Sequence, residues 1–345
     1  MRELTVGVLL NAEYPPAELL RLGELAEMLG YHSLWYTDVR MLRECYVGLA
    51  ALAMRTSRIR LATGVTDPYS RHPAVTAASI ATIDELSGGR AILGLGLGGA
   101  GFRELGIEKT LPIAALRESI DVMRRLWHGQ QVSTVGKVVS IQRGRLQFPV
   151  QRPAIPIYIA TQGAQVSRLA GQLADGVLIA NTVVPAALDA YLQRIGEGLA
   201  KAGRSYADID INIRWEACIS HDEAAAMAVM RKRLAERLMN SYPNWDYLRA
   251  LGMEIPTAFE EIAARKDASF VDAAAEMLPM EIVDASVLAG SPARLLPRIK
   301  AMLRPEVTGI IIRPHACPGT GIDDVMKSFM QDIAAHVGGR GSSAS

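Results

Sequence analysis

The chain has 345 residues, of which 50% are hydrophobic and 21% are charged. This supply of apolar side chains is enough to bury a large core, so disorder is not the default expectation for the chain. The 37 lysines and arginines nearly balance the 36 aspartates and glutamates, so no surface field of one sign is expected and nucleic acid is a poor candidate partner.

Short apolar runs alternate with segments of helical periodicity along the chain. The apolar runs predict strands at 4–10, 33–37, 59–64, 90–95, 155–160, 176–180, 209–214 and 309–313. The helical segments are 15–29, 46–55, 73–86, 114–127, 164–173, 185–202, 222–239, 291–303 and 322–337. This order predicts an α/β fold, a single (β/α)8 TIM barrel forming one domain over 1–337. An open doubly wound sheet is the alternative, and it usually brings a clear cofactor fingerprint that this chain lacks.

Three segments fall outside this alternation. Residues 132–148 are polar with a turn near Gly136-Lys137, which predicts a hairpin excursion at the edge of the barrel. Residues 241–284 contain aromatic and amphipathic pieces, which we interpret as a helical insertion that acts as a lid. Residues 338–345, GGRGSSAS, are small and polar and are predicted to be a disordered tail.

The three cysteines, at 45, 218 and 317, are odd in number and far apart in the sequence. They fit neither a disulfide framework nor a metal knuckle, and they predict a reducing cytoplasm. The charged residues after Met1 and the shortness of the first apolar run predict neither a signal peptide nor a membrane span. Motifs such as HExxH, CxxC and clustered carboxylates are absent, so no metal site is predicted.

Residues 62–74, ATGVTDPYSRHPA, follow the third predicted strand and carry many hydrogen-bonding groups. They stand at the carboxyl end of a buried strand, where α/β barrels place their chemistry. Gly64, next to Val65, leaves room for a flat ring against bare backbone, although an ordinary glycine at a strand end is the alternative. His72 precedes a proline at a predicted helix start, so we expect it to cap that helix or pack against it.

Two further loops are rich in small residues. The segment GLGLGGAG at 94–101 follows the fourth strand, but no helix opens directly after it and it is therefore a weak dinucleotide fingerprint. It favours close approach of backbone to a planar ligand, with a flexible turn as the alternative. The loop at 160–163 leads into a helix whose free N–H groups form a natural phosphate seat.

These segments together resemble the bacterial luciferase-like superfamily, and in particular the branch that uses the deazaflavin coenzyme F420, which includes the methylenetetrahydromethanopterin reductases. The resemblance covers roughly residues 3–337 and implies a cis peptide bond between Gly64 and Val65, behind the deazaflavin ring. It implies coenzyme contacts at Asp38, Gly64, Val65, Thr66, Gly96 and Gly98, and contacts with the phosphate tail at Gln162, Gly163, Gln165 and Val166.

The resemblance implies hydride transfer between F420 and a small or medium organic substrate. Two alternatives stay open: an FMN-dependent two-component monooxygenase, and a barrel that binds a flavin or deazaflavin without catalysis. A flavin or F420 reductase is an expected partner. The hydrophobic helices after the second and third strands predict a homodimer, as is common in this superfamily.

The proton donor is not identified by the sequence. Superfamily members that oxidise alcohols or sugar phosphates have a histidine directly after the aspartate that matches Asp38, and here that residue is Val39. They also have a glutamate near the position of Gly99, whereas Glu104 lies a few residues further on. Asp38 is one weak candidate. His315 is the other, because it follows the eighth strand and a histidine side chain exchanges protons near neutral pH.

Overall fold

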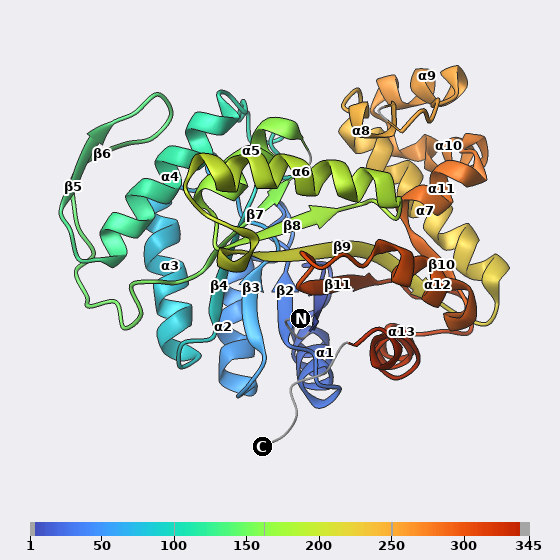
Figure 1. Cartoon of the computed structure of the whole chain (residues 1–345), viewed down its shortest axis with the longest axis horizontal. Coiled ribbons are helices and arrows are strands. Elements are labelled where there is room, and N and C mark those ends of the chain that lie inside the picture. The colour runs from blue at the N-terminus through green and yellow to red at the C-terminus, as the bar shows by residue number, and fades with distance from the viewer. Residues whose placement is uncertain (1–3, 100, 162, 250, 339–345) are drawn as a thin grey trace.

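The computed structural model describes residues 4–99, 101–161, 163–249 and 251–338. Eight parallel strands close into a barrel in the order β1-β2-β3-β4-β7-β8-β9-β11, with β11 pairing back to β1. The strands are β1 (Thr5–Leu10), β2 (Ser33–Tyr36), β3 (Arg60–Thr63), β4 (Ala91–Leu95), β7 (Ile157–Thr161), β8 (Gly176–Ala180), β9 (Asp210–Ile219) and β11 (Gly309–Pro314). The predicted (β/α)8 barrel is confirmed (Figure 1).

Helices follow the strands and surround the barrel (Figure 1). They are α1 (Pro16–Met28), α2 (Cys45–Arg55), α3 (Pro73–Leu86), α4 (Pro112–Trp127), α5 (Ala164–Leu173), α6 (Pro185–Lys201), α7 (Glu223–Ser241), α12 (Pro292–Met302) and α13 (Ile322–Ser328). Several of them begin with proline, whose fixed φ and missing N–H suit the first helical turn. The predicted closing helix at 322–337 is wrong in detail, because α13 passes into a π-helical turn at Phe329–Ile333 and a 3₁₀ turn at Ala334–His336.

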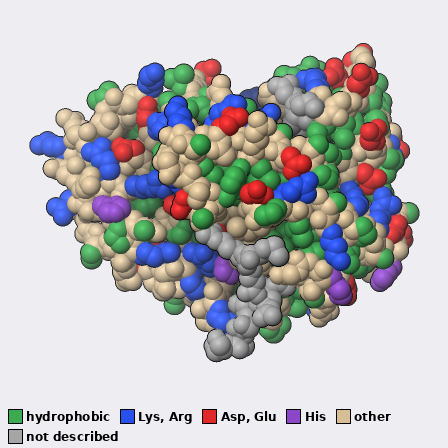
Figure 2. All heavy atoms as spheres, viewed as in Figure 1, with side chains coloured by type: hydrophobic (Ala, Val, Ile, Leu, Met, Phe, Trp, Pro, Cys, Tyr) green, Lys and Arg blue, Asp and Glu red, His purple; other side chains and the backbone are tan. Residues whose placement is uncertain are grey.

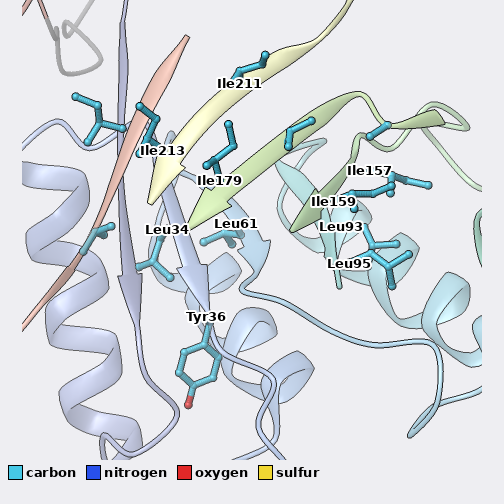
Figure 3. Close-up of a cluster of buried hydrophobic side chains, with 14 of the residues drawn as sticks. Leu34, Tyr36, Leu61, Leu93, Leu95, Ile157, Ile159, Ile179, Ile211 and Ile213 are labelled. Carbon is cyan, nitrogen blue, oxygen red and sulfur yellow. The ribbon is translucent and has the colours of Figure 1, made fainter. Parts of the chain in front are cut away.

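The strands are apolar on both faces because both faces are covered. One set of side chains, among them Leu34, Leu61 and Ile213, points outward to the helices (Figure 3). The alternate set fills the barrel interior and comprises Leu9, Trp35, Ala62, Ile92, Tyr158, Leu178 and Ile311. The interior is therefore a packed plug, and a ligand can enter only above it, at an end of the barrel.

The predicted excursion is a two-stranded hairpin, β5 (Val132–Val135) and β6 (Ser140–Gly144), beside α4 (Figure 1). The predicted end of the seventh strand at residue 214 is wrong. Strand β9 continues to Ile219 because β10 (Leu288–Gly290), which the sequence did not predict, pairs with its second half. This extension carries one charged side chain, Glu216, beyond the barrel plug.

The segment 241–284 is helical, as predicted. It contains α8 (Asp246–Arg249), α9 (Thr257–Arg265), α10 (Val271–Met277) and α11 (Met280–Ser286), which lie with α7 at the side opposite the hairpin (Figure 1). It has a hydrophobic core of its own in which the buried rings of Trp245 and Phe259 pack with residues of α7. The insertion is therefore a second packed unit attached to the barrel rather than a loose loop.

Three remaining predictions concern the surface charge, membrane spans and the C-terminal tail. Basic and acidic side chains are interspersed over the face in Figure 2, as the near balance of charge predicts. No helix in the described ranges is both long enough and apolar enough to cross a membrane. Of the predicted tail, residues 339–345 lie outside the described residues.

Candidate active site

The carboxyl ends of the barrel strands surround a cavity of about 640 Å³. Its lining comes from loops that are distant in sequence: Asn11 and Glu13 after β1, Val39 after β2, Gly98 after β4, and Arg313 and His315 at the end of β11. Helix α7 and the start of the insertion complete the wall. This is the end of the barrel at which α/β barrels carry out their chemistry.

The floor of this mouth is apolar and closely packed. Val65 and Ala160 pack on the interior plug. A Cβ atom added to Gly96 would lie 2.7 Å from Val65 Cγ2, so glycine at this position lets Val65 close the floor. The peptide bond between Gly64 and Val65 is cis, as the resemblance implies. Gly96 thus faces the side chain of Val65, whereas Gly98 packs closely on the Phe102 ring and also lines the cavity.

A buried ion pair links three of the loops around the floor. Arg40, after β2, contacts Asp67, after β3, and the Arg40 guanidinium lies 4.3 Å from the centre of the Phe102 ring, directly after the glycine-rich segment 94–101. Asp67 also accepts hydrogen bonds from the backbone N–H groups of Tyr69 and Ser70, both at 2.7 Å. The carboxylate of Asp67 is therefore satisfied by local donors as well as by Arg40.

Asp38 lies beside this pair and is half-buried. It accepts a 2.7 Å hydrogen bond from the Thr66 hydroxyl, which joins two residues that the sequence predicted at the coenzyme. Burial raises the pKa of Asp38, while the Thr66 hydrogen bond and the charge of Arg40 partly offset that effect. A carboxyl group of this kind can carry a proton closer to neutral pH than an exposed aspartate.

The two other basic side chains of the 62–74 segment, Arg71 and His72, have partners at the starts of neighbouring helices. Arg71 pairs with Glu44 at 2.5 Å, at the start of α2. The Nδ1 atom of His72 accepts from the backbone N–H of Ala74 and caps α3, which confirms the expected capping role.

The opposite wall is a charged cluster around Glu216 of β9. Glu216 Oε1 accepts a 2.6 Å hydrogen bond from Arg214, and Oε2 lies 2.5 Å from His315 Nε2. Arg313, whose Cα is the register partner of Glu216, approaches Oε2 at 3.6 Å. Arg214 also donates to Asn181 Oδ1 at 2.6 Å. The cluster thus brings together side chains from β9, β11 and the loop after β8.

The electrostatics of this cluster keep Glu216 ionised. Burial opposes its ionisation, but the positive charges of Arg313 and Arg214 and the hydrogen bond from His315 outweigh burial and hold its pKa well below its ordinary value. Burial lowers the pKa of Arg214, while Glu216 acts in the opposite direction. Because an ionised carboxylate only accepts hydrogen bonds, Nε2 of His315 carries a proton and Nδ1 is the nitrogen left for exchange.

The predicted phosphate seat lies at the start of α5. Gly163 is the residue before the first turn, no side chain caps it, and a Cβ added there would meet nothing within 4 Å. The side chain of Gln165 is exposed, whereas that of Val166 is buried in the core, so only the backbone N–H of Val166 is available to a ligand. Gln162 lies outside the described residues.

Sequence reasoning missed Arg40, Arg214 and Glu216. The sequence does carry a signal for Arg214 and Glu216. They are two residues apart in the strand sequence INIRWE, so their side chains point to the same, inward face of β9. Within the part of the chain that the structure describes, no three histidine, cysteine, aspartate or glutamate side chains gather as metal ligands would.

Comparison with known proteins agrees with this geometry. The family model for luciferase-like monooxygenases matches residues 4–308. The chain is 33% identical over 310 residues to the 5,10-methylenetetrahydromethanopterin reductase of Methanolobus tindarius, covering 89% of this chain and 93% of the relative. It is 30% identical over 351 residues to the F420-dependent glucose-6-phosphate dehydrogenase of Rhodococcus erythropolis, covering 96% and 97%.

A solved structure extends the likeness to three dimensions. The coenzyme F420-dependent tetrahydromethanopterin reductase of Methanopyrus kandleri superposes with a TM-score of 0.85 at 27% identity, over 97% of this chain and 99% of that protein. The barrel, its polar mouth and these matches along the chain lead to one assignment: the chain belongs to the luciferase-like monooxygenase family.

Proposed function

We propose that this chain is an F420-dependent oxidoreductase that acts on a small or medium organic substrate. The relatives at 30–33% identity are named as F420-dependent dehydrogenases and methylenetetrahydromethanopterin reductases. The observation that carries the proposal is the mouth of the barrel, where an apolar floor lies beside an uncapped helix amino terminus. When bound, the deazaflavin supplies hydride transfer at its C5 atom.

The residues of the chain divide into three tasks in this proposal. Val65 and the backbone around Gly96 and Gly98 support the flat ring. Asp38, held by Thr66, contacts the polar edge of the ring. The backbone at Gly163, Gln165 and Val166 binds the phosphate tail, because the free N–H groups and the helix dipole favour an anion there; Gln162 belongs to the same proposed contact.

We assign the role of proton donor to the His315–Glu216 pair, with Asp38 as the second candidate. His315 lines the cavity and its ring is oriented by the ionised Glu216. This arrangement leaves Nδ1 to exchange a proton with the substrate while Nε2 stays protonated. The interior plug and the insertion exclude water from the same space.

The coenzyme assignment predicts binding of F420 at micromolar concentration or tighter, with FMN bound at least roughly tenfold more weakly, a difference of about 1.4 kcal/mol. Fluorescence titration of the purified protein with each coenzyme measures both constants. Binding of FMN without binding of F420 would overturn the assignment in favour of a two-component monooxygenase with a flavin reductase as its partner. F420 binding without hydride transfer to any acceptor would instead favour a non-catalytic barrel.

The same proposal includes cytoplasmic location and a separate reductase that regenerates reduced F420. The three cysteines are free and buried, which agrees with a reducing compartment. Regeneration is needed because each reduction of substrate by this enzyme consumes one reduced coenzyme.

We also propose that α2 and α3 form the interface of a homodimer. Val47 and Met54, one face of α2, are 69% and 70% exposed, and Val75 of α3 is 49% exposed. An apolar stripe of this kind on a surface helix marks an interaction site. The double substitution Val47→Glu and Met54→Glu should convert the dimer to a monomer in sedimentation velocity, whereas Met280→Glu, in the insertion, should leave it dimeric. A monomeric wild-type protein would contradict the interface.

A further inference from the structure

An arginine without a partner lies in the wall of the mouth. Arg237 is on α7 and lines the 640 Å³ cavity. Both of its terminal nitrogens, Nη1 and Nη2, are buried and have no hydrogen-bond partner within the described residues. A buried guanidinium without a partner is costly, and it calls for an explanation such as an ion or ligand that belongs there.

The neighbouring arginines differ from Arg237 because each has a carboxylate. Arg233, one turn earlier on α7, lies 3.3 Å from Glu236. Arg214 and Arg313 share Glu216. The Glu216 carboxylate is thus already occupied by two arginines and His315, and it leaves the charge of Arg237 uncompensated. Besides burial, the positive charges of Arg237 and Arg313 both lower the pKa of Arg214, which indicates that the three guanidinium groups lie near one another.

We propose that Arg237 is the anchor of an anion subsite that binds a phosphate or carboxylate group at the mouth. A guanidinium presents two parallel N–H groups that match the oxygens of such an anion. Because the cavity reaches from Arg237 to His315 and Arg313, an anion on Arg237 would hold the rest of its molecule beside the His315–Glu216 pair. This assignment deepens the proposed function, on which the identity of the bound molecule as a substrate rests.

Two molecules could bring the anion: the substrate or the coenzyme's own tail. The substrate is favoured by the positions of the two helices. Helix α5, whose uncapped start is the proposed seat of the coenzyme's phosphate, follows β7, and α7 follows β9. Strand β8 separates β7 from β9 in the barrel. The anion subsite and the phosphate seat therefore belong to separate parts of the mouth.

The test uses coenzyme-free protein with inorganic phosphate as the probe, and compares Arg237→Met with Arg233→Met. Phosphate should raise the melting temperature of the wild type and of Arg233→Met by mass action, and this rise should be smaller in Arg237→Met, where only the phosphate seat at the start of α5 remains. Loss of the charge-assisted hydrogen bonds predicts roughly ten- to a hundredfold weaker phosphate binding. Without phosphate, Arg237→Met should melt no lower than the wild type, because the variant removes an unpaired buried charge.

A second arm separates the two sources of the anion. If the substrate brings it, Arg237→Met should bind F420 with unchanged affinity, and phosphate should still stabilise the F420-loaded wild type. Weaker binding of F420, with unchanged binding of a deazaflavin that lacks the phosphate tail, would assign Arg237 to the coenzyme and overturn the substrate assignment. A phosphate response that is equal in the wild type and Arg237→Met would overturn the subsite itself. Failure of F420 to bind to any variant, with the phosphate response intact, would refute the proposed function and leave the anion subsite standing.

Discussion

Glu216→Gln is expected to lower the free energy of unfolding by about 3–5 kcal/mol at neutral pH, the usual cost of removing one partner from a buried ion pair. The substitution keeps the size of the side chain and removes the one carboxylate that Arg214, Arg313 and His315 share. The positive charges of Arg214 and Arg313 then lose the carboxylate that they share. Urea denaturation followed by tryptophan fluorescence measures the loss.

The pH dependence of this loss has a defined sign. Because the pKa of Glu216 is held well below its ordinary value in the folded protein, its ionised form stabilises the fold at every pH above the unfolded value of about 4.3. That contribution disappears only as the pH falls through the lower, folded-state pKa. The difference in the free energy of unfolding between wild type and variant should therefore stay constant from about pH 7 to 5 and become smaller below about pH 4.

Glu236→Gln is the matched control for this experiment. Glu236 lines the same cavity, but its side chain is half exposed and its pairing with Arg233 is a surface contact. Surface pairs contribute little, so this variant should unfold like the wild type. Equal losses in the two variants, or a difference that closes between pH 7 and 6, would show that Glu216 does not hold the cluster together.

The barrel could be predicted from sequence because its strands are covered on both faces. Each strand is then a short continuous apolar run, whereas in the helices between the strands the apolar residues recur every three to four positions. The same rule explains the principal error. Arg214 and Glu216 interrupt the apolar run of β9, so the strand is predicted to end at 214, whereas in the structure it continues through both charged residues to Ile219.

The site was predictable only where a loop has a characteristic local sequence. Gly64, Gly96 and Gly163 lie in such loops, and the structure places them at the floor and at the start of α5, while their contacts with the coenzyme stay a prediction. Arg237 could not be identified in this way, because α7 carries several arginines and only tertiary packing decides which of them is buried without a partner. The pairing of Arg40 with Asp67 likewise depends on two loops that meet only once the barrel has closed.

Arg40→Met is expected to cost about 3 kcal/mol of folding free energy, near the lower end for a buried pair, and to weaken F420 binding. The lower end applies because Asp67 retains hydrogen bonds from Tyr69 and Ser70 when Arg40 is removed. Coenzyme binding should suffer because Arg40 connects the loops after β2 and β3 to Phe102.

The double variant Arg40→Met with Asp67→Asn tests the pairing directly. Removing both charges should recover part of the stability lost in Arg40→Met, because Asp67 no longer carries an uncompensated buried charge. Arg71→Met is the matched control: it breaks a pair with the exposed Glu44, which precedes α2, and should cost less than about 1 kcal/mol. If Arg40→Met and Arg71→Met lost the same stability and bound F420 equally well, the buried pair would have no role in shaping the mouth, and the floor would have to be held by Val65 and its glycine neighbours alone.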